Sequence, residues 1–195
     1  MMKSKYAALL PLVAVVALLQ PPFCACSMNE DLLLSFSKSE IVTDVIPAVP
    51  ERALNVSYSA GAVVNLGNIL TPAQTAHAPD VNVVGNPDHW STVILLDPDA
   101  PSRSDPKMRH WLHWLVVNVP HNETTTLMKY AGPTPPPGSG RHRYVFLAYE
   151  QKQPVARNAL SGFAKERAKF NLTAFLEALG VHQLVAANFF YAENK

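Results

Sequence analysis

The sequence predicts a mainly β protein, a sandwich of antiparallel sheets with one or two peripheral helices. Short apolar segments, several with strand-like alternation, recur along the chain and are separated by loops. Proline supplies 17 of the 195 residues, nearly twice its usual share of ~5%. Because proline lacks a backbone donor and fixes φ, this composition favours strands joined by rigid loops over long helices.

The composition also limits the class of protein. Hydrophobic residues make up 48% of the chain and charged residues 16%, which suffices for a packed core and excludes a disordered chain. A length of 195 residues suits one domain. The formal net charge is +1, so the overall charge does not direct the protein to nucleic acid or to an anionic membrane surface.

Residues 1–26 have the features of a signal peptide. Two lysines near the start precede an apolar run over residues 7–19, which is shorter than the ~20 residues of a membrane span. Small residues at 24–26 suit a signal peptidase, and we expect cleavage after Cys26 or Ser27. A short membrane anchor is the alternative interpretation.

The expected mature chain, residues 27–195, is a single secreted, extracellular domain without a transmembrane segment. The only two cysteines, Cys24 and Cys26, would leave with the signal peptide, so the mature protein would have no disulfide in an oxidising compartment. Its stability must then come from the hydrophobic core, which a chain of this length can supply.

The first half of the chain contains four candidate elements. Residues 31–42 suit a short helix or an entry strand. Alternating apolar residues predict strands at 53–58 and 62–66. Prolines punctuate residues 72–87, which predicts a loop-rich stretch. The nearly continuous apolar run at 91–96 is typical of a buried strand.

The second half contains more strands and one helix. Three further strands are expected at 111–119, 144–150 and 185–191. The segment 132–140, Gly-Pro-Thr-Pro-Pro-Pro-Gly-Ser-Gly, can form neither helix nor ladder and must be a rigid connector. Asn171 suits the N-cap of a helix over residues 172–179, which Gly180 ends.

Three asparagines stand in the Asn-x-Ser/Thr pattern of N-glycosylation: Asn55, Asn122 and Asn171. Three such sequons behind a signal peptide predict that at least one carries a glycan. Strand alternation turns Asn55 outward, because Leu54 and Val56 occupy the apolar face.

Three short motifs contain the residues best suited to a binding site. Asp97-Pro98-Asp99-Ala100-Pro101 follows a buried strand directly, and its prolines hold the loop rigid, although a plain Asp-Pro turn would look the same. In the next strand, alternation places Trp111, His113, Leu115 and Val117 on one face. After the connector, His142 and Tyr144 share a face and Arg143 points the other way. Taken singly, a histidine or tyrosine in such a strand is more often a packing residue.

The order of these motifs resembles the phosphatidylethanolamine-binding protein family. The pattern is Asp-Pro-Asp-Ala-Pro, a strand with an inward histidine, a Pro/Gly loop and Gly-x-His-Arg-Tyr. Residues 63–72 and 167–170 are also similar, and the likeness covers roughly residues 35–193. The resemblance implies a β-sandwich with a small pocket for phosphate-like groups near one end, and a cis bond at Ala100–Pro101. It also implies a ligand-binding set of Asp97, Asp99, Ala100, Pro101, Trp111, His113, Pro136, His142 and Tyr144.

Three features depart from the commonest family pattern, and one of them is a chain that ends soon after Tyr191, which predicts a more open pocket. Leu112 replaces the first of two adjacent histidines, and alternation turns it away from the pocket. Thr134 stands where a glycine is usual, which adds a side chain at the pocket edge.

The chemistry of the set favours a singly charged ligand. His113, His142 and Tyr144 can donate hydrogen bonds to an anion. An ionised Asp97 would repel phosphate, unless it accepts from a ligand hydroxyl or protonated phosphate oxygen, orients His113, or meets the ammonium of an ethanolamine-like headgroup. We therefore hypothesise that a zwitterion or monoanion suits the site better than a dianion.

The function expected from these observations is the non-enzymatic binding of a phospholipid headgroup or small phosphate-like anion. An extracellular serine protease inhibitor, another signalling modulator acting on a protease or receptor, and a carrier of small hydrophobic ligands such as odorants are the alternatives. The chain has no Gly-x-Ser-x-Gly and no His-Glu-x-x-His motif. We expect no cofactor and no metal, although two histidines and two aspartates could in principle bind one.

Overall fold

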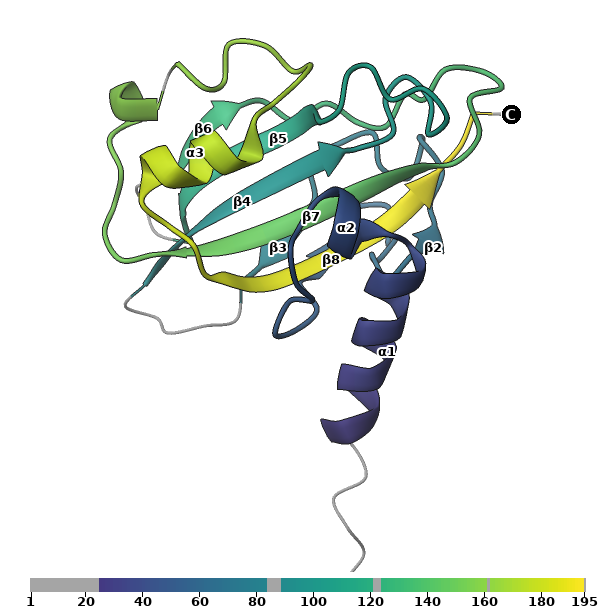
Figure 1. Ribbon diagram of the computed structural model, residues 1–195, viewed down its shortest axis with the longest axis horizontal. Coiled ribbons are helices and arrows are strands. Elements are labelled where there is room, and N and C mark those ends of the chain that lie inside the picture. The colour runs from purple at the N-terminus through teal and green to yellow at the C-terminus, as the bar shows by residue number, and fades with distance from the viewer. Residues whose placement is uncertain (1–24, 84–88, 121–123, 161, 195) are drawn as a thin grey trace, which may run out of the picture.

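The computed structural model describes residues 25–83, 89–120, 124–160 and 162–194. Two sheets dominate these residues, with short helices packed on one side (Figure 1). The predicted β-sandwich with peripheral helices is therefore confirmed. The predicted signal peptide lies almost wholly outside the described residues, and the single domain over 27–195 stays a prediction. No helix in the described ranges is long and apolar enough to cross a membrane.

The larger sheet has six strands in the order β2-β8-β7-β4-β5-β6. Its neighbours are antiparallel except for β2 and β8, which run parallel. The strands are β2 (Asn68–Ile69), β4 (Trp90–Asp97), β5 (Trp111–Val119), β6 (Thr125–Met128), β7 (His142–Gln151) and β8 (Leu184–Ala192). The smaller sheet pairs β1 (Asn55–Ser57) with β3 (Asp80–Asn82). The strands expected at 53–58, 91–96, 111–119, 144–150 and 185–191 are confirmed within a few residues.

The large sheet is covered on both faces, so the central strands β4 and β7 are buried at nearly every position. On one face, Ile94, Leu96 and Leu147 pack against the helices. On the other, Val93 and Phe146 pack against the small sheet and the segment around it. Figure 1 shows α2 and α3 in front of the large sheet and β3 behind it.

The helices that pack on the large sheet come from the N-terminal and the C-terminal parts of the described chain. Helix α1 (Ala25–Lys38) and the short α2 (Ile41–Asp44) replace the alternative of an entry strand. Leu32 and Phe36 are four residues apart, so they lie on one face of α1 and reach the core. A 3₁₀ turn, η1 (Arg157–Leu160), precedes helix α3.

Helix α3 (Leu172–Leu179) begins and ends as predicted. The Asn171 side chain accepts a hydrogen bond from the Ala174 N–H at 3.0 Å, and Gly180 adopts a left-handed conformation with φ +71°. Leu172 and Phe175 are buried beneath the helix.

Residues 62–66 do not form the predicted strand. The segment makes only a single bridge, between Ser57 and Val63. The Asn188 side chain takes the place of a strand partner, because it donates to the Val64 carbonyl and accepts from the Leu66 N–H. The alternation was still a true indicator of burial, since Val64 is buried and Val63 is exposed.

Replacing Gly67 by alanine is expected to lower the free energy of unfolding by about 2–3 kcal/mol. Gly67 has φ +95°, and a Cβ there would lie 2.8 Å from the Phe189 ring. Gly61 has φ +78° with nothing within 4 Å of its Cβ position. Gly61→Ala therefore adds only the backbone strain, and should cost roughly half as much in a denaturant titration. Equal losses at both sites would contradict the role of the Phe189 contact.

Candidate functional site

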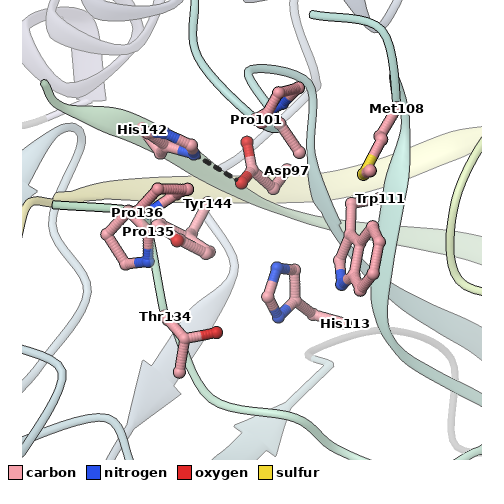
Figure 2. A pocket seen from close by; sticks show the side chains of 11 residues that line it. Asp97, Pro101, Met108, Trp111, His113, Thr134, Pro135, Pro136, His142 and Tyr144 are labelled. Carbon is pink, nitrogen blue, oxygen red and sulfur yellow. Dashed lines mark hydrogen bonds and ion pairs between the residues drawn. The ribbon is translucent and has the colours of Figure 1, made fainter. Parts of the chain in front are cut away.

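A cavity of about 280 Å³ lies where β4, β5 and β7 meet the connector 132–140. Figure 2 shows the Asp97–His142 pair and the rings of His113 and Tyr144 around the same space. The lining residues are Asp97, Ala100, Pro101, Met108, Trp111, His113, Thr134, Pro135, Pro136, His142 and Tyr144. Eight of the nine sequence-predicted site residues are thus brought together, and the ninth, Asp99, is not. Whether they bind a ligand stays a prediction.

The first three residues of β7 lie alternately on the two faces of the sheet, as the alternation predicted. His142 and Tyr144 both line the cavity, and their rings stack with centroids 6.5 Å apart. Arg143 between them is fully buried on the opposite face.

Asp97 orients His142 and not His113. Its Oδ2 lies 2.7 Å from His142 Nδ1, and its Oδ1 accepts from the Asp99 N–H at 2.7 Å. The suggestion that Asp97 positions His113 was therefore wrong. Strand β4 lies between β7, which carries His142, and β5, which carries His113. The Nδ1 of His113 is bound by the Ala131 carbonyl, so that nitrogen does not face Asp97.

The second nitrogen of His142 contacts the hydroxyl of Ser139. Ser139 Oγ donates to the Pro136 carbonyl at 2.7 Å, so its 2.9 Å contact with His142 Nε2 is satisfied when the ring donates. The ring then also meets the Asp97 carboxylate at Nδ1. The Asp97 carboxylate is thus held between His142 and the Asp99 N–H at the wall of the cavity.

His113 is held by the backbone. Its Nδ1 donates to the Ala131 carbonyl at 2.7 Å, which leaves Nε2 for the cavity as an acceptor. Burial is the main influence on this ring and lowers the pKa of His113, and the bond to Ala131 only partly opposes it. The neutral ring is therefore favoured at neutral pH.

The placement of His113 depends on a bulge in β5. Leu95 pairs with Trp114 and Leu96 with Leu112, so His113 is an extra residue in the ladder. The bulge reverses the alternation beyond it. Leu115 and Val117 consequently face the helices together with Leu112. The prediction of one shared face is thus wrong beyond His113, because Leu115 and Val117 do not lie on the face of Trp111 and His113. The prediction that Leu112 faces away from the pocket is confirmed.

Tyr144 supplies a hydroxyl to the cavity. The residue is 1% exposed, and its hydroxyl has no hydrogen-bond partner among the described residues. The oxygen is nevertheless not among the fully buried polar atoms that lack a partner. It therefore opens into the cavity that the residue lines. Burial, reinforced by the charges of Asp97 and Asp99, raises the pKa of Tyr144. The group is therefore a hydrogen-bond donor at any ordinary pH.

Asp99 belongs to a buried ion network behind the cavity. Its Oδ2 accepts from the backbone N–H and the Nε of Arg143, both at 2.9 Å, and its Oδ1 accepts from the same guanidinium at 2.5 Å. Burial alone would raise the pKa of Asp99, but the bonds from Arg143 outweigh it and hold the pKa below its usual value. The prediction that Asp99 lines the pocket is wrong, because its carboxylate follows Arg143 to the opposite face.

Sequence reasoning missed three contributors to the site. Met108 and Pro135 line its wall. Ser139 forms a hydrogen bond with His142 Nε2. Ser139 stands three residues before His142 in the Gly-rich part of the connector, which was the available signal. Met108 comes from the loop between β4 and β5, and no local pattern marks it. Thr134 reaches the edge of the cavity, as its replacement of a glycine suggested.

The predicted cis bond at Ala100–Pro101 is present. Among the described residues, no group of three or more His, Cys, Asp and Glu side chains is placed to hold a metal ion.

Two of the three predicted glycosylation sites lie within the described residues. Asn55 is exposed on β1, as its alternation required. Asn171 is also exposed, and its cap uses only the side-chain oxygen, not the nitrogen to which a glycan is attached. Asn122 falls outside the described residues. Occupancy of all three stays a prediction.

The fold and the cavity define a β-sandwich protein with a small, partly polar pocket at one end of its main sheet. Comparison with known proteins makes the class specific. A model of the phosphatidylethanolamine-binding protein family matches residues 58–190. This protein belongs to that family, as the order of its motifs indicated.

Known proteins with different descriptions are similar to this chain. A 26 kDa secreted antigen of Toxocara canis is 35% identical over 164 residues, which cover 81% of this chain but only 63% of that protein. A carboxypeptidase Y inhibitor, solved with its cognate proteinase, is 30% identical with a TM-score of 0.72, over 85% of this chain and 96% of that one. A phosphatidylethanolamine-binding protein from Plasmodium vivax is 25% identical with a TM-score of 0.69, over 84% and 97%.

Proposed function

We propose that this protein is a non-enzymatic binding protein for a small headgroup that carries a phosphoryl anion with a single negative charge. The observation that carries the proposal is the pairing of two unused polar groups on the cavity wall. Tyr144 offers a donor and the neutral His113 ring offers an acceptor at Nε2. A phosphoryl oxygen fits the donor, and a P–OH or an ammonium N–H fits the acceptor.

The same pairing disfavours a dianion. A fully ionised phosphate has only acceptors, so it would face the acceptor nitrogen of His113 and the Asp97 carboxylate without a proton between them. The cavity is also small. At about 280 Å³ it lies below the ~300–1,000 Å³ of typical ligand pockets, which suits a headgroup and not a long apolar chain.

The test is a titration followed through the histidine ring signals by NMR. Phosphoethanolamine loses its second phosphate proton near pH 6, whereas glycerophosphoethanolamine, a diester, keeps one negative charge throughout. We expect phosphoethanolamine to bind at least about tenfold more tightly at pH 5 than at pH 8, because one hydrogen bond becomes a repulsive contact. The diester should change much less. Tighter binding of phosphoethanolamine at pH 8 would overturn the proposal.

A variant assigns the binding to the cavity. Tyr144→Phe removes the donor and should weaken phosphoethanolamine binding by about tenfold or more, the usual value of a hydrogen bond to a charged group. Tyr191→Phe is the matched control, because it removes a hydroxyl from the neighbouring strand, where Tyr191 packs on the helix side. Equal effects of the two variants would place the ligand elsewhere.

We propose further that the protein is secreted, a proposal supported by the secreted antigen of Toxocara canis among its relatives. Extracellular protease inhibition is the second candidate function, because a carboxypeptidase Y inhibitor is among the similar structures. Incubating the protein with a panel of serine proteases separates the two functions. Stoichiometric inhibition that survives Tyr144→Phe would assign inhibition to a surface other than the cavity.

A further inference from the structure

A second hollow lies on the helix side of the large sheet, away from the cavity just described. It has a volume of about 520 Å³, within the ~300–1,000 Å³ typical of small-molecule sites. The segment after α2, helix α3 and the start of β8 surround it. Its lining residues are Val45, Pro47, Ala48, Val49, Glu51, Tyr149, Leu172, Thr173, Leu176, Glu177, His182, Gln183 and Leu184.

The two cavities are separated by the sheet itself. Tyr149 lies five residues beyond Tyr144 on β7, so the two side chains project from opposite faces and are about 17 Å apart along the strand. The hydrophobic clusters agree, because Tyr144 packs with the small-sheet core and Tyr149 with the helix-side core. A ligand in the second hollow is therefore independent of one in the first.

Tyr149 provides a buried polar group that the fold does not use. The residue is 4% exposed, and its hydroxyl has no hydrogen-bond partner among the described residues. This oxygen, too, is not among the fully buried polar atoms that lack a partner. It therefore opens into the hollow that the residue lines. Burial raises the pKa of Tyr149 to about 12, which keeps the hydroxyl protonated. Such a group ordinarily pairs with protein, water or a ligand.

The wall of the hollow is apolar and its rim is acidic. Val45, Leu176 and Leu184 supply partly buried aliphatic surface. Glu51 and Glu177 are both exposed at the rim. Neither makes an ion pair with another described residue, and Glu51 only accepts from Gln183 at 3.3 Å. No lysine or arginine is among the lining residues.

We propose that this hollow is a second binding site, for a small amphiphilic cation with an aliphatic body and a protonated amine. The aliphatic body would lie against Val45, Leu176 and Leu184, and the ammonium would lie between the two rim carboxylates. The Tyr149 hydroxyl would bond to a polar atom of the ligand or to a water that the ligand retains. The two cavities of the protein would then select opposite charges.

The test is isothermal titration of the purified protein with octylamine, and with octanoate and octanol as probes of the same length but different charge. We expect saturable binding of one octylamine per chain, at least tenfold tighter than that of octanoate, with octanol between them. Equal affinity for the amine and the acid would overturn the assignment of charge. A titration without saturable octylamine binding would overturn the site.

Two variants locate the binding without risk to the fold. The double variant Glu51→Gln, Glu177→Gln changes only exposed side chains and should reduce octylamine affinity to that of octanol. Tyr149→Phe should weaken octylamine binding by about three- to tenfold. Tyr191→Phe, a hydroxyl lost from the same core at the other end of β8, should leave it unchanged. Octylamine binding that is indifferent to the double variant and to Tyr149→Phe would place the ligand elsewhere and overturn the proposal.

Discussion

Replacing Arg143 by methionine is expected to lower the free energy of unfolding by about 3–5 kcal/mol, the usual cost of breaking a buried ion pair from one side. Arg143 is fully buried. Its guanidinium donates to both oxygens of Asp99, to the Ser39 carbonyl at 2.8 Å and to Asp44 at 2.7 Å. Without it, the Asp99 carboxylate keeps the backbone N–H of residue 143 at 2.9 Å, but its nearest cation is the distant guanidinium of Arg109, at 3.9 Å.

A surface ion pair provides the matched control. Arg103 lies 2.6 Å from Glu40, but both side chains are well exposed, so Arg103→Met should cost under about 1 kcal/mol. Arg143→Lys should behave like Arg143→Met, because an ammonium cannot reproduce the two-pronged contact with Asp99. Chemical denaturation with an unchanged m-value measures all three variants. Equal midpoints for Arg143→Met and the unaltered protein would contradict the structural role of the network.

The second large effect is a loss of stability in mild acid. Burial, reinforced by the charge of Arg109, lowers the pKa of His110 from 6.5 to about 4. The Nδ1 of this ring is buried and has no hydrogen-bond partner within the described part of the chain. Burial also lowers the pKa of His113. Between pH 6.5 and 4, the unfolded chain binds a proton at His110 that the folded protein does not. The contribution of the neutral histidine to the free energy of unfolding is therefore fully present above pH 6.5, and it is lost as the pH is lowered toward 4.

The slope of this loss is about 1.4 kcal/mol per pH unit for each such histidine, so His110 alone accounts for roughly 3 kcal/mol by pH 4. His113 adds to the loss in the same direction. The measurement is the midpoint of urea unfolding at half-unit steps from pH 7.5 to 4. His110→Leu removes the titrating ring. It should lower the slope of the unfolding free energy against pH, on the acid side, by the amount that corresponds to about one bound proton. An identical acid limb in that variant would show that the destabilisation has another source.

The ion network and the cavity share strand β7, which gives the N-terminal helices a structural role at the site. Arg143 ties Ser39 and Asp44, at the ends of α1 and α2, to the loop that carries Asp99. That loop continues into Ala100 and Pro101 on the cavity wall. Arg143, next to His142, and Asp99, two residues after Asp97, are thus anchored to each other on the far side of the sheet. This anchoring holds the cavity wall in place before any ligand arrives.

Much of the site could be predicted because its residues stand in short motifs on strands. His142 and Tyr144 are two residues apart, and period-two alternation alone places them on one side with Arg143 on the other. Asp97 ends an apolar run, which marks the edge of the sheet. The roles of the two aspartates could not be separated in this way, because the Asp97 Oδ1 bond to the Asp99 N–H turns the chain between them.

Patterns in the sequence were enough to predict the β-sandwich, the position of most strands, the caps of α3 and the membership of the family. These depend on local patterns: alternation, proline and glycine at turns, and a polar cap before a helix. Packing in three dimensions sets the bulge at His113, the partner of Asp97, the pairing of Asp99 with Arg143, and the acidic hollow beside α3. Each of these depends on contacts between residues far apart in the chain, where register and packing, and not local preference, choose the partner.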